Sequence, residues 1–225
     1  MTPQTIQQGA EAIIYKINNK VVKERIPKSY RLKELDNKLR KKRTKSEAKI
    51  INKLQGIIPV PELLADPGMG RMIHMQYING KKLSEHLESL DYKQICKQIA
   101  QTISKLHNQD IIHGDLTTSN MIYVKNNKTN KTPSSHPNLL INNSNKGEQE
   151  GKVYLIDFGL SFHSHKIEDK AVDLHLIQQA LNAKHFKIAN QAIKIILNNY
   201  KPLRYKEILE KLKVVESRGR YKERG

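Results

Sequence analysis

Apolar and polar residues alternate near the N-terminus with the period of a strand and then take up the period of a helix. Residues 12–17 and 20–26, "AIIYKI" and "KVVKERI", are rich in β-branched side chains and are separated by Asn18 and Asn19. This arrangement predicts a hairpin. The charged segment that follows, from about 31 to 55, predicts a long helix.

The middle and the end of the chain repeat this change from strands to helices. Residues 71–78 predict a strand, and 92–107 predict a helix with one buried stripe. The apolar residues of that stripe are Ile95, Ile99, Ile103 and Leu106. Two further strands are predicted in "NMIYV" and "KVYLIDFG", and three helical stretches fill the chain from Glu168 onward.

Residues 125–150 are rich in Asn, Ser, Lys and Pro, and such a composition cannot bury a core. We therefore expect a disordered insertion that lengthens a hairpin. Because strands come first and helices later, the sequence predicts an α+β fold of two lobes within one domain. We expect a small β-rich lobe over about 1–78, a mainly helical lobe over about 79–216, and a basic tail over 217–225.

Composition narrows the class of protein. With 37% hydrophobic and 28% charged residues the chain is typical of a soluble globular protein. No apolar run approaches the roughly 18 residues that a membrane span needs, and the first residues do not resemble a signal peptide. We therefore expect no membrane and a location in the cytoplasm, the nucleus or both. The single cysteine, Cys96, excludes an internal disulfide and is interpreted as a core residue.

The net charge of +18 favours an anionic partner, although a genome rich in AT codons could also supply many of the lysines. Two basic clusters stand out. One is "LRKKRTK" at 39–45, within the predicted long helix, and the other is "SRGRYKERG" at the C-terminus. The alternative interpretation is a solvated helix face and a frayed end.

Candidate chemistry begins in the stretch "IIHGDLTTSN", where Asp115 and Asn120 lie five positions apart after an apolar run. Alone, both could be ordinary turn residues. A second acidic candidate, Asp157, follows the apolar strand in "LIDFG". Phosphoryl transfer needs Mg²⁺, a cation on the phosphates and a carboxylate that orients the attacking hydroxyl. Asp115 offers that carboxylate, while Asn120 and Asp157 offer the oxygen ligands that Mg²⁺ prefers.

The required cation should lie on a strand of the small lobe, and "VVKERI" places Lys23 there. Glu47, in the long helix that follows, is a candidate partner to hold it. These five residues occur in the expected order and in the expected kinds of element, which is a stronger signal than any one of them.

These motifs resemble the protein-kinase superfamily over nearly the whole chain: Lys23 resembles the strand lysine, Glu47 its helix partner, "HGDLTTSN" the catalytic loop and "DFG" the metal-binding turn. Within it the chain most resembles the small atypical kinase family of the KEOPS (EKC) tRNA-modification complex, which includes PRPK. The segments that carry this closer resemblance are "QGAEA", "VVKERIPKSYR", "RTKSEA", "IDFGLS", "EDKAVDL" and "RGRYKERG".

The resemblance implies a serine/threonine kinase or ATPase that binds ATP and Mg²⁺. Asp115, Lys23 and Glu47 would be catalytic, with Asn120 and Asp157 as metal ligands. Gly9, Met75 and Tyr77 would approach the nucleotide, although core packing explains Met75 equally well. The implied partners are the transferase subunit of that complex, an ASKHA-type ATPase, a small subunit that binds the small lobe, and tRNA. The basic tail, with Arg218, Arg220, Lys222 and Arg224, would contact nucleic acid and could reach phosphates near the active site.

Several positions depart from ordinary kinases. The loop "QQGAEAIIY" keeps only Gly9, so we expect a looser grip on phosphate. Gly114 replaces the usual Arg that answers an activation-loop phosphate, and Thr117 replaces a Lys. No A-P-E sequence lies between Asp157 and Asp173, so a full activation segment is absent. Asp173 either ties its helix to the catalytic loop, as the resemblance implies, or is a helix-face carboxylate.

The histidines are weaker candidates. His113 is interpreted as packing and hydrogen bonding beneath the loop rather than acting as a base. His163 and His165 are interpreted as loop residues, because two imidazoles without further ligands do not make a metal site.

Two other functions stay open. A small-molecule phosphotransferase of the aminoglycoside or choline type also carries an "HGDL" loop. A catalytically silent scaffold of kinase fold is the other alternative, but a scaffold has no electrostatic reason to keep all five residues.

Overall fold

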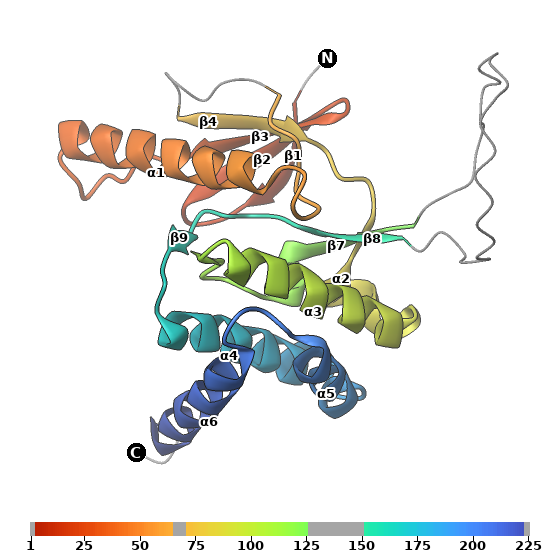
Figure 1. Ribbon diagram of the computed structural model, residues 1–225. Coiled ribbons are helices and arrows are strands. Elements are labelled where there is room, and N and C mark those ends of the chain that lie inside the picture. The colour runs from red at the N-terminus through yellow and green to blue at the C-terminus, as the bar shows by residue number, and fades with distance from the viewer. Residues whose placement is uncertain (1–2, 65–70, 126–150, 223–225) are drawn as a thin grey trace, which may run out of the picture.

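The computed structural model describes residues 3–64, 71–125 and 151–222, with side chains described as far as Arg218. The predicted α+β fold is confirmed, with a four-stranded sheet and one long helix in the first part of the chain and mainly helices, joined by short strands, in the second (Figure 1). The insertion predicted at 125–150 lies outside the described residues except for Lys125, and so does Arg224.

The first lobe is a four-stranded antiparallel sheet accompanied by one long helix (Figure 1). The strands occur in the order β1 (Gln4–Gln8), β2 (Ala12–Ile17), β3 (Lys20–Arg25) and β4 (Met72–Gln76), and the helix is α1 (Lys33–Leu54). The predicted hairpin is β2–β3, in which Asn18 adopts a positive φ of 55° that Asn tolerates better than most residues. The sheet therefore places Lys23 and Arg25 on one face of the central strand β3.

Strand β1 was not predicted, because all five of its residues are exposed and "QTIQQ" has no apolar alternation. Its pairing with β2 through the backbone creates it. The basic cluster of the long helix α1 is partly turned inward, which the alternative interpretation of a solvated helix face does not account for. Its buried residues include Arg40 and Thr44 from the basic cluster, and Arg40 donates a hydrogen bond to buried Asp36 (2.7 Å). Sequence charge alone does not reveal such inward-facing pairs.

The second lobe is helical, with short strands lying toward the first lobe (Figure 1). Its helices are α2 (Leu83–His86), η1 (Leu87–Ser89), α3 (Tyr92–Asn108), η2 (Thr118–Asn120), α4 (Ile167–Lys184), α5 (Ala189–Asn199) and α6 (Tyr205–Lys222). Its strands are β5 (Lys81–Lys82), β6 (Ile111–Ile112), β7 (Met121–Val124), β8 (Lys152–Leu155) and β9 (Phe162–His163). Helix α6 continues through residue 222, so the segment predicted as a basic tail begins inside a helix.

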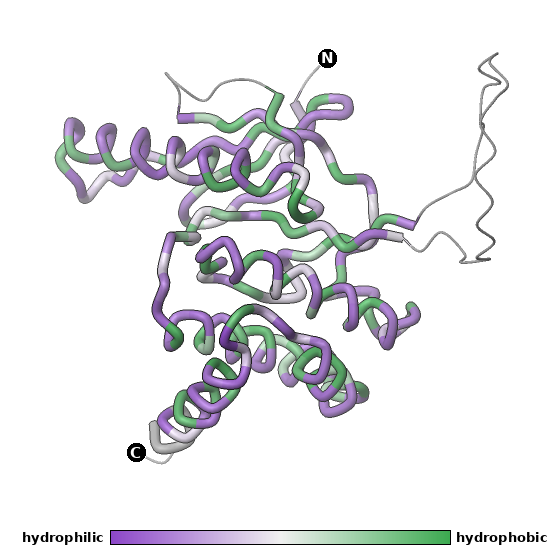
Figure 2. The backbone as a smooth tube through the Cα atoms, in the orientation of Figure 1, coloured by the Kyte–Doolittle hydropathy of each residue, from purple (hydrophilic) through white to green (hydrophobic). Residues whose placement is uncertain are grey.

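Helix α3 forms the centre of the core, as its apolar stripe predicts. Ile95, Ile99, Ile103 and Leu106 are all buried. Along the helices hydrophobic and hydrophilic residues alternate, as expected of helices with one face in a core (Figure 2). Cys96 is a core residue, and burial raises the pKa of its thiol to about 12. None of the described helices is both long and apolar enough to cross a bilayer.

Replacing Ile103 with Ala should lower the free energy of unfolding by about 2–5 kcal/mol, because it empties part of a closely packed core. Urea denaturation measures this loss. Lys97→Ala, on the exposed side of the same helix, should change it by no more than about 0.5 kcal/mol. Equal losses in the two variants would contradict the central place of α3 in the core.

Candidate active site

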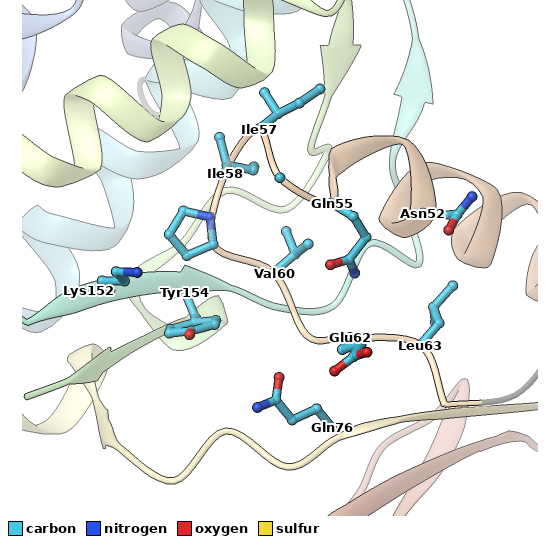
Figure 3. Close-up of a pocket in the computed structure, with 12 residues that line it drawn as sticks. Asn52, Gln55, Ile57, Ile58, Val60, Glu62, Leu63, Gln76, Lys152 and Tyr154 are labelled. Carbon is cyan, nitrogen blue, oxygen red and sulfur yellow. The ribbon is translucent and has the colours of Figure 1, made fainter. Parts of the chain in front are cut away.

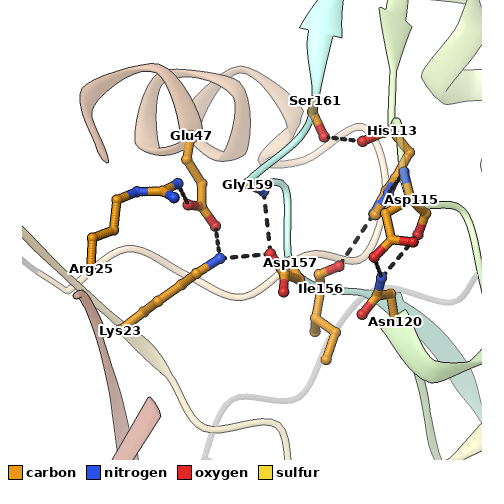
Figure 4. Close-up of polar contacts among 10 residues, drawn as sticks. All are labelled: Lys23, Arg25, Glu47, His113, Asp115, Asn120, Ile156, Asp157, Gly159 and Ser161. Carbon is orange, nitrogen blue, oxygen red and sulfur yellow. Dashed lines mark hydrogen bonds and ion pairs between the residues drawn. The ribbon is translucent and has the colours of Figure 1, made fainter. Parts of the chain in front are cut away.

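A buried ion pair joins the sheet to the long helix. Lys23 Nζ on β3 donates to Glu47 Oε1 on α1 at 2.7 Å, and both side chains are almost fully buried. Arg25, two positions along the same strand, donates from Nη2 to the other oxygen, Glu47 Oε2, at 2.6 Å (Figure 4). One carboxylate therefore holds two cations. Arg25 was not predicted, although its spacing from Lys23 places both on one face of a strand.

Lys23 also reaches across the cleft to the second lobe. Its Nζ donates to Asp157 Oδ1 at 2.6 Å, and the Gly159 N–H donates to the same oxygen at 3.3 Å (Figure 4). Asp157 has a φ of 61°, a left-handed conformation that is uncommon for any residue but Gly. Such conformations cost energy and gather at functional sites, because the surrounding contacts hold them in place.

The charges of this cluster shift its pKa values in opposite directions. Burial alone would lower the pKa of Lys23, but the charges of Glu47 and Asp157 outweigh it and raise that pKa. Burial alone would raise the pKa of Asp157, but Lys23 and the Gly159 N–H lower it. By linkage, the Lys23 contribution to stability is present below its unfolded pKa near 10.5 and is lost as pH rises through the folded value. The Asp157 contribution is present above pH 3.8 and is lost as pH falls through the lower folded value.

Asp115 and Asn120 face each other across the turn that precedes β7. Asn120 Nδ2 donates to the Asp115 backbone oxygen at 2.9 Å and to Asp115 Oδ2 at 2.8 Å (Figure 4). Both amide hydrogens are thereby used, which leaves the amide oxygen of Asn120 to face other ligands. The arrangement keeps the amide oxygen of Asn120 beside the carboxylate of Asp115.

The loop that carries Asp115 is supported from below by Asp173 of α4. Asp173 is fully buried and accepts hydrogen bonds from the backbone N–H groups of His113 (2.6 Å) and Gly114 (2.9 Å). Of the two interpretations of Asp173, the structure therefore supports the tie to the loop. His113 accepts from the Asp115 N–H at Nδ1 and contacts the Ile156 oxygen at 3.2 Å through Nε2. Burial lowers the pKa of His113, which keeps the ring neutral near pH 7.

The buried network extends further, to residues that sequence reasoning missed. His107 Nε2 donates to Asp173 Oδ2 at 3.3 Å, so its Nδ1 accepts from the hydroxyl of Tyr200 at 2.6 Å. All three side chains are fully buried. Tyr200 follows α5 and lies 93 positions from His107, so no local pattern could have paired them.

Gly114 has a structural reason to replace the usual Arg. Its φ is 78°, and a Cβ there would lie only 2.5 Å from the backbone oxygen of Leu160. A side chain at this position would collide with the segment after Asp157. The residue change thus accompanies close packing of two backbone segments.

Two adjacent cavities form the cleft between the lobes. One has a volume of about 150 Å³ and is lined largely by apolar side chains, with Ile14, Val21, Met75 and Tyr77 among its lining residues. Lys23, Asn120 and Asp157 also line it. The other has a volume of about 240 Å³ and is lined by polar and small residues that include Gly9, Lys23, Arg25, Asp115 and Asp157. The cleft therefore brings together every predicted catalytic and nucleotide-binding residue.

A third hollow, of about 720 Å³, shares Gln76 with the first of these cavities. It is lined by the end of α1, residues 55–60, 62 and 63, Gln76, and Lys152 and Tyr154 of β8 (Figure 3). It contains none of the predicted site residues.

Of the predicted nucleic-acid residues, the structure describes the side chain of Arg218, which lies on α6. Arg218 Nη1 donates to Glu168 Oε1 of α4 at 2.6 Å, and Lys211 also pairs with Glu168. Arg218 does not line either cavity of the cleft, and its expected contact with phosphates near the active site stays a prediction. Its helix points away from the cleft because α6 packs against α4 (Figure 1). The side chains of Arg220 and Lys222 are outside the described residues.

His163 and His165 occur as loop and edge residues. His163 pairs with Ile111 through the backbone, and exposed His165 contacts Asp110 at 2.8 Å. In the part of the chain that the structure describes, no group of three or more His, Cys, Asp or Glu residues could hold a metal ion.

Comparison with known proteins identifies the family. Residues 10–192 match the ABC1 atypical kinase-like domain. The chain is 38% identical to the KEOPS complex subunit Bud32 of Pyrococcus abyssi, over 97% of this chain and 96% of that protein. The chain belongs to this family of KEOPS kinases.

A second relative is longer. The chain is 34% identical to a probable bifunctional tRNA threonylcarbamoyladenosine biosynthesis protein of Methanothermobacter thermautotrophicus, covering 98% of this chain but 37% of that protein. Among solved structures, the Rio2 kinase of Chaetomium thermophilum in its ADP/Mg²⁺-phosphoaspartate complex superposes with a TM-score of 0.60 at 14% identity. That match covers 96% of this chain and 70% of that one. The predicted kinase-like fold and family are thus confirmed.

Removing the hydroxyl of Tyr200 should destabilise the fold because it leaves His107 Nδ1 buried without a partner. We expect Tyr200→Phe to lower the free energy of unfolding by about 1–3 kcal/mol in urea denaturation.

The matched control is Tyr92→Phe, because the Tyr92 hydroxyl also joins α3 to α5, through Gln191, but at an exposed site. Its loss should stay within about 0.5 kcal/mol. The importance of the buried network would be refuted by equal losses in the two variants.

Proposed function

We propose that this protein is the phosphoryl-transfer subunit of a KEOPS-type complex, a kinase or ATPase that uses ATP and Mg²⁺ to support formation of threonylcarbamoyladenosine in tRNA. The observation that carries the proposal is the meeting of Lys23, Glu47, Asp157, Asp115 and Asn120 around one cleft. The names of its relatives, a KEOPS subunit and a tRNA threonylcarbamoyladenosine biosynthesis protein, support the biological setting.

The donor chemistry of the cleft suits Mg²⁺. Asp157 supplies a carboxylate held ionised by Lys23, and Asn120 supplies an amide oxygen. Mg²⁺ is usually bound by one or two carboxylates together with substrate phosphates rather than by an all-protein cage, so two protein ligands are sufficient. Asp157 and Asn120 would hold Mg²⁺, which when bound would neutralise negative charge on the phosphates.

Each residue then has a role in binding or proton transfer. The apolar cavity with Met75 and Tyr77 would accept the adenine ring, and Gly9 would lie over the phosphates. Glu47 holds Lys23 in reach of the phosphates. Asp115, oriented by Asn120, would accept the proton of the attacking hydroxyl, which belongs either to a protein side chain or to water.

The proposed partners are the transferase subunit, the small subunit on the first lobe, and tRNA. The net charge of +18 favours a phosphate-rich partner. Arg218 is tied to Glu168, so binding of RNA phosphate there would have to compete with an exposed ion pair, which is a weak interaction. Because tRNA is the proposed substrate of the complex, we propose that this protein acts in the cytoplasm, the nucleus or both.

Replacing Asp115 with Ala should reduce the turnover of MgATP by about 10²- to 10⁴-fold, because a positioned general base is lost. This equals roughly 3–5 kcal/mol of transition-state stabilisation, while nucleotide should still bind. The measurement follows labelled γ-phosphate with the protein alone and then with the transferase subunit and tRNA.

Asp157→Ala serves as the blank and Glu88→Ala, an exposed carboxylate, as the control. Release of phosphate chiefly with partner and tRNA present would identify an ATPase, and transfer to protein in both conditions would identify a kinase. Absence of turnover in both conditions would favour the scaffold alternative, and full turnover by Asp115→Ala would remove Asp115 from the mechanism.

Charge in the C-terminal segment should govern the salt dependence of tRNA binding. Changing Arg218, Arg220, Lys222 and Arg224 together to Gln should reduce the slope of log Kd against log salt by up to about one per residue. The control changes four exposed lysines outside both basic clusters to Gln, an equal loss of charge: Lys93, Lys97, Lys105 and Lys184. An unchanged slope in the C-terminal variant would make that segment a solvated helix end.

A further inference from the structure

Arg25 is a buried cation with more hydrogen-bonding capacity than its partner uses. Only 5% of the residue is exposed, and its bond with Glu47 occupies one of its five N–H groups. Among the described residues, Arg25 Nε is one of only three buried side-chain nitrogen or oxygen atoms without a partner. A buried guanidinium with unmet donors is costly, which points to a missing anionic partner.

The charges around Arg25 also leave room for an anion. Lys23 and Arg25 share the single charge of Glu47, and the second negative charge, that of Asp157, pairs with Lys23 alone. If Asp157 turns to a metal ion, as proposed above, Lys23 loses that partner. Two cations then face the cleft with one carboxylate between them, and this excess suits phosphate.

Space for that anion exists beside the cations. Arg25 lines the more polar cavity together with Gly9, Lys23, Asp115 and Gly159. A Cβ on Gly159 would lie 3.2 Å from Lys23 Nζ and 3.5 Å from Arg25 Nη2, so the absence of a side chain there leaves space beside both cations. Strand register places Arg25 opposite Ala12, next to the loop 9–11, whereas Lys23 lies opposite Ile14. Arg25 is therefore the cation nearer the loop that would cover the phosphates.

We propose that Arg25 is a second phosphate-binding residue, which contacts the terminal phosphates of a nucleoside triphosphate beside Lys23. The planar guanidinium can donate to phosphate and to Glu47 together, because its N–H groups point in several directions. The contact compensates for a covering loop that keeps only one glycine. This inference rests on the proposed nucleotide-binding function.

A purely structural role for Arg25, holding Glu47 in place, makes a different prediction. A structural role acts through Glu47 and Lys23, so its effect should disappear once Glu47 is replaced by Gln. A direct phosphate contact depends on how many phosphates the nucleotide carries and should persist in the Glu47→Gln background. Isothermal titration of the intact chain with ATP, ADP and AMP, with Mg²⁺ present, separates the two.

For Arg25→Gln we expect Kd for ATP to rise roughly ten- to a hundredfold, with a smaller rise for ADP and less than about a twofold change for AMP. Arg31→Gln is the matched control, because Arg31 pairs with Asp36 outside the cleft. This variant should bind all three nucleotides as the parent does. Arg25→Lys keeps the charge beside Glu47 without the fork and should fall between the parent and Arg25→Gln. It also provides the test if Arg25→Gln does not fold.

Equal weakening of all three nucleotides, or unchanged binding of ATP, would overturn the phosphate contact. So would the absence of any further loss of ATP binding when Arg25→Gln is added to Glu47→Gln, which would leave Arg25 as a support for Glu47. Failure of the parent chain to bind ATP would overturn the proposed function itself and this inference with it. The two failures are distinguished by the parent protein.

Discussion

The contact of Lys23 with Glu47 is the interaction on which the candidate site depends. It joins a strand to the helix that covers it, and through Asp157 it joins the first lobe to the second. Buried charges are stable only when they are paired, so loss of any member leaves an uncompensated charge. Arg25 adds a second tie to Glu47, and Arg40 adds another by donating to the backbone oxygen of Arg25. Helix α1 is thereby held against the sheet by charges of the chain itself.

The second lobe also contains a buried carboxylate, but in the described part of the chain this one is held by hydrogen bonds and not by a lysine or arginine. Asp173 has no lysine or arginine partner among the described residues and instead accepts hydrogen bonds from two backbone N–H groups and from His107. Such bonds hold the loop before Asp115 in one conformation. Gly114 lets the backbone of Leu160 approach the same loop, where most kinases have an Arg. Backbone packing, rather than an ion pair with a phosphorylated residue, therefore orders the loop before Asp115.

Much of the fold can be predicted from the local sequence pattern, and the elements and residues that the pattern missed were missed for related reasons. The hairpin β2–β3 and the stripe of α3 were predictable because burial of apolar residues leaves a period in the sequence. Strand β1 has exposed polar residues and exists through backbone pairing, which leaves no period. In the first half of α1 the buried residues are polar, so Asp36 and Arg40 were indistinguishable from solvated residues. Arg25 and Tyr200 were missed because their partners are remote in the chain.

The sequence by itself determined the chemistry that the protein can use. It contains Lys23, Glu47, Asp115, Asn120 and Asp157 in a recognisable order, since motifs keep their residue types and spacing along the chain. Only the tertiary structure decided how these groups share their charges, that Arg25 joins them, and that Arg218 lies outside the cleft. Coulombic and hydrogen-bonding energies depend on the distance between groups and on their burial, and neither quantity can be obtained from the order of residues alone.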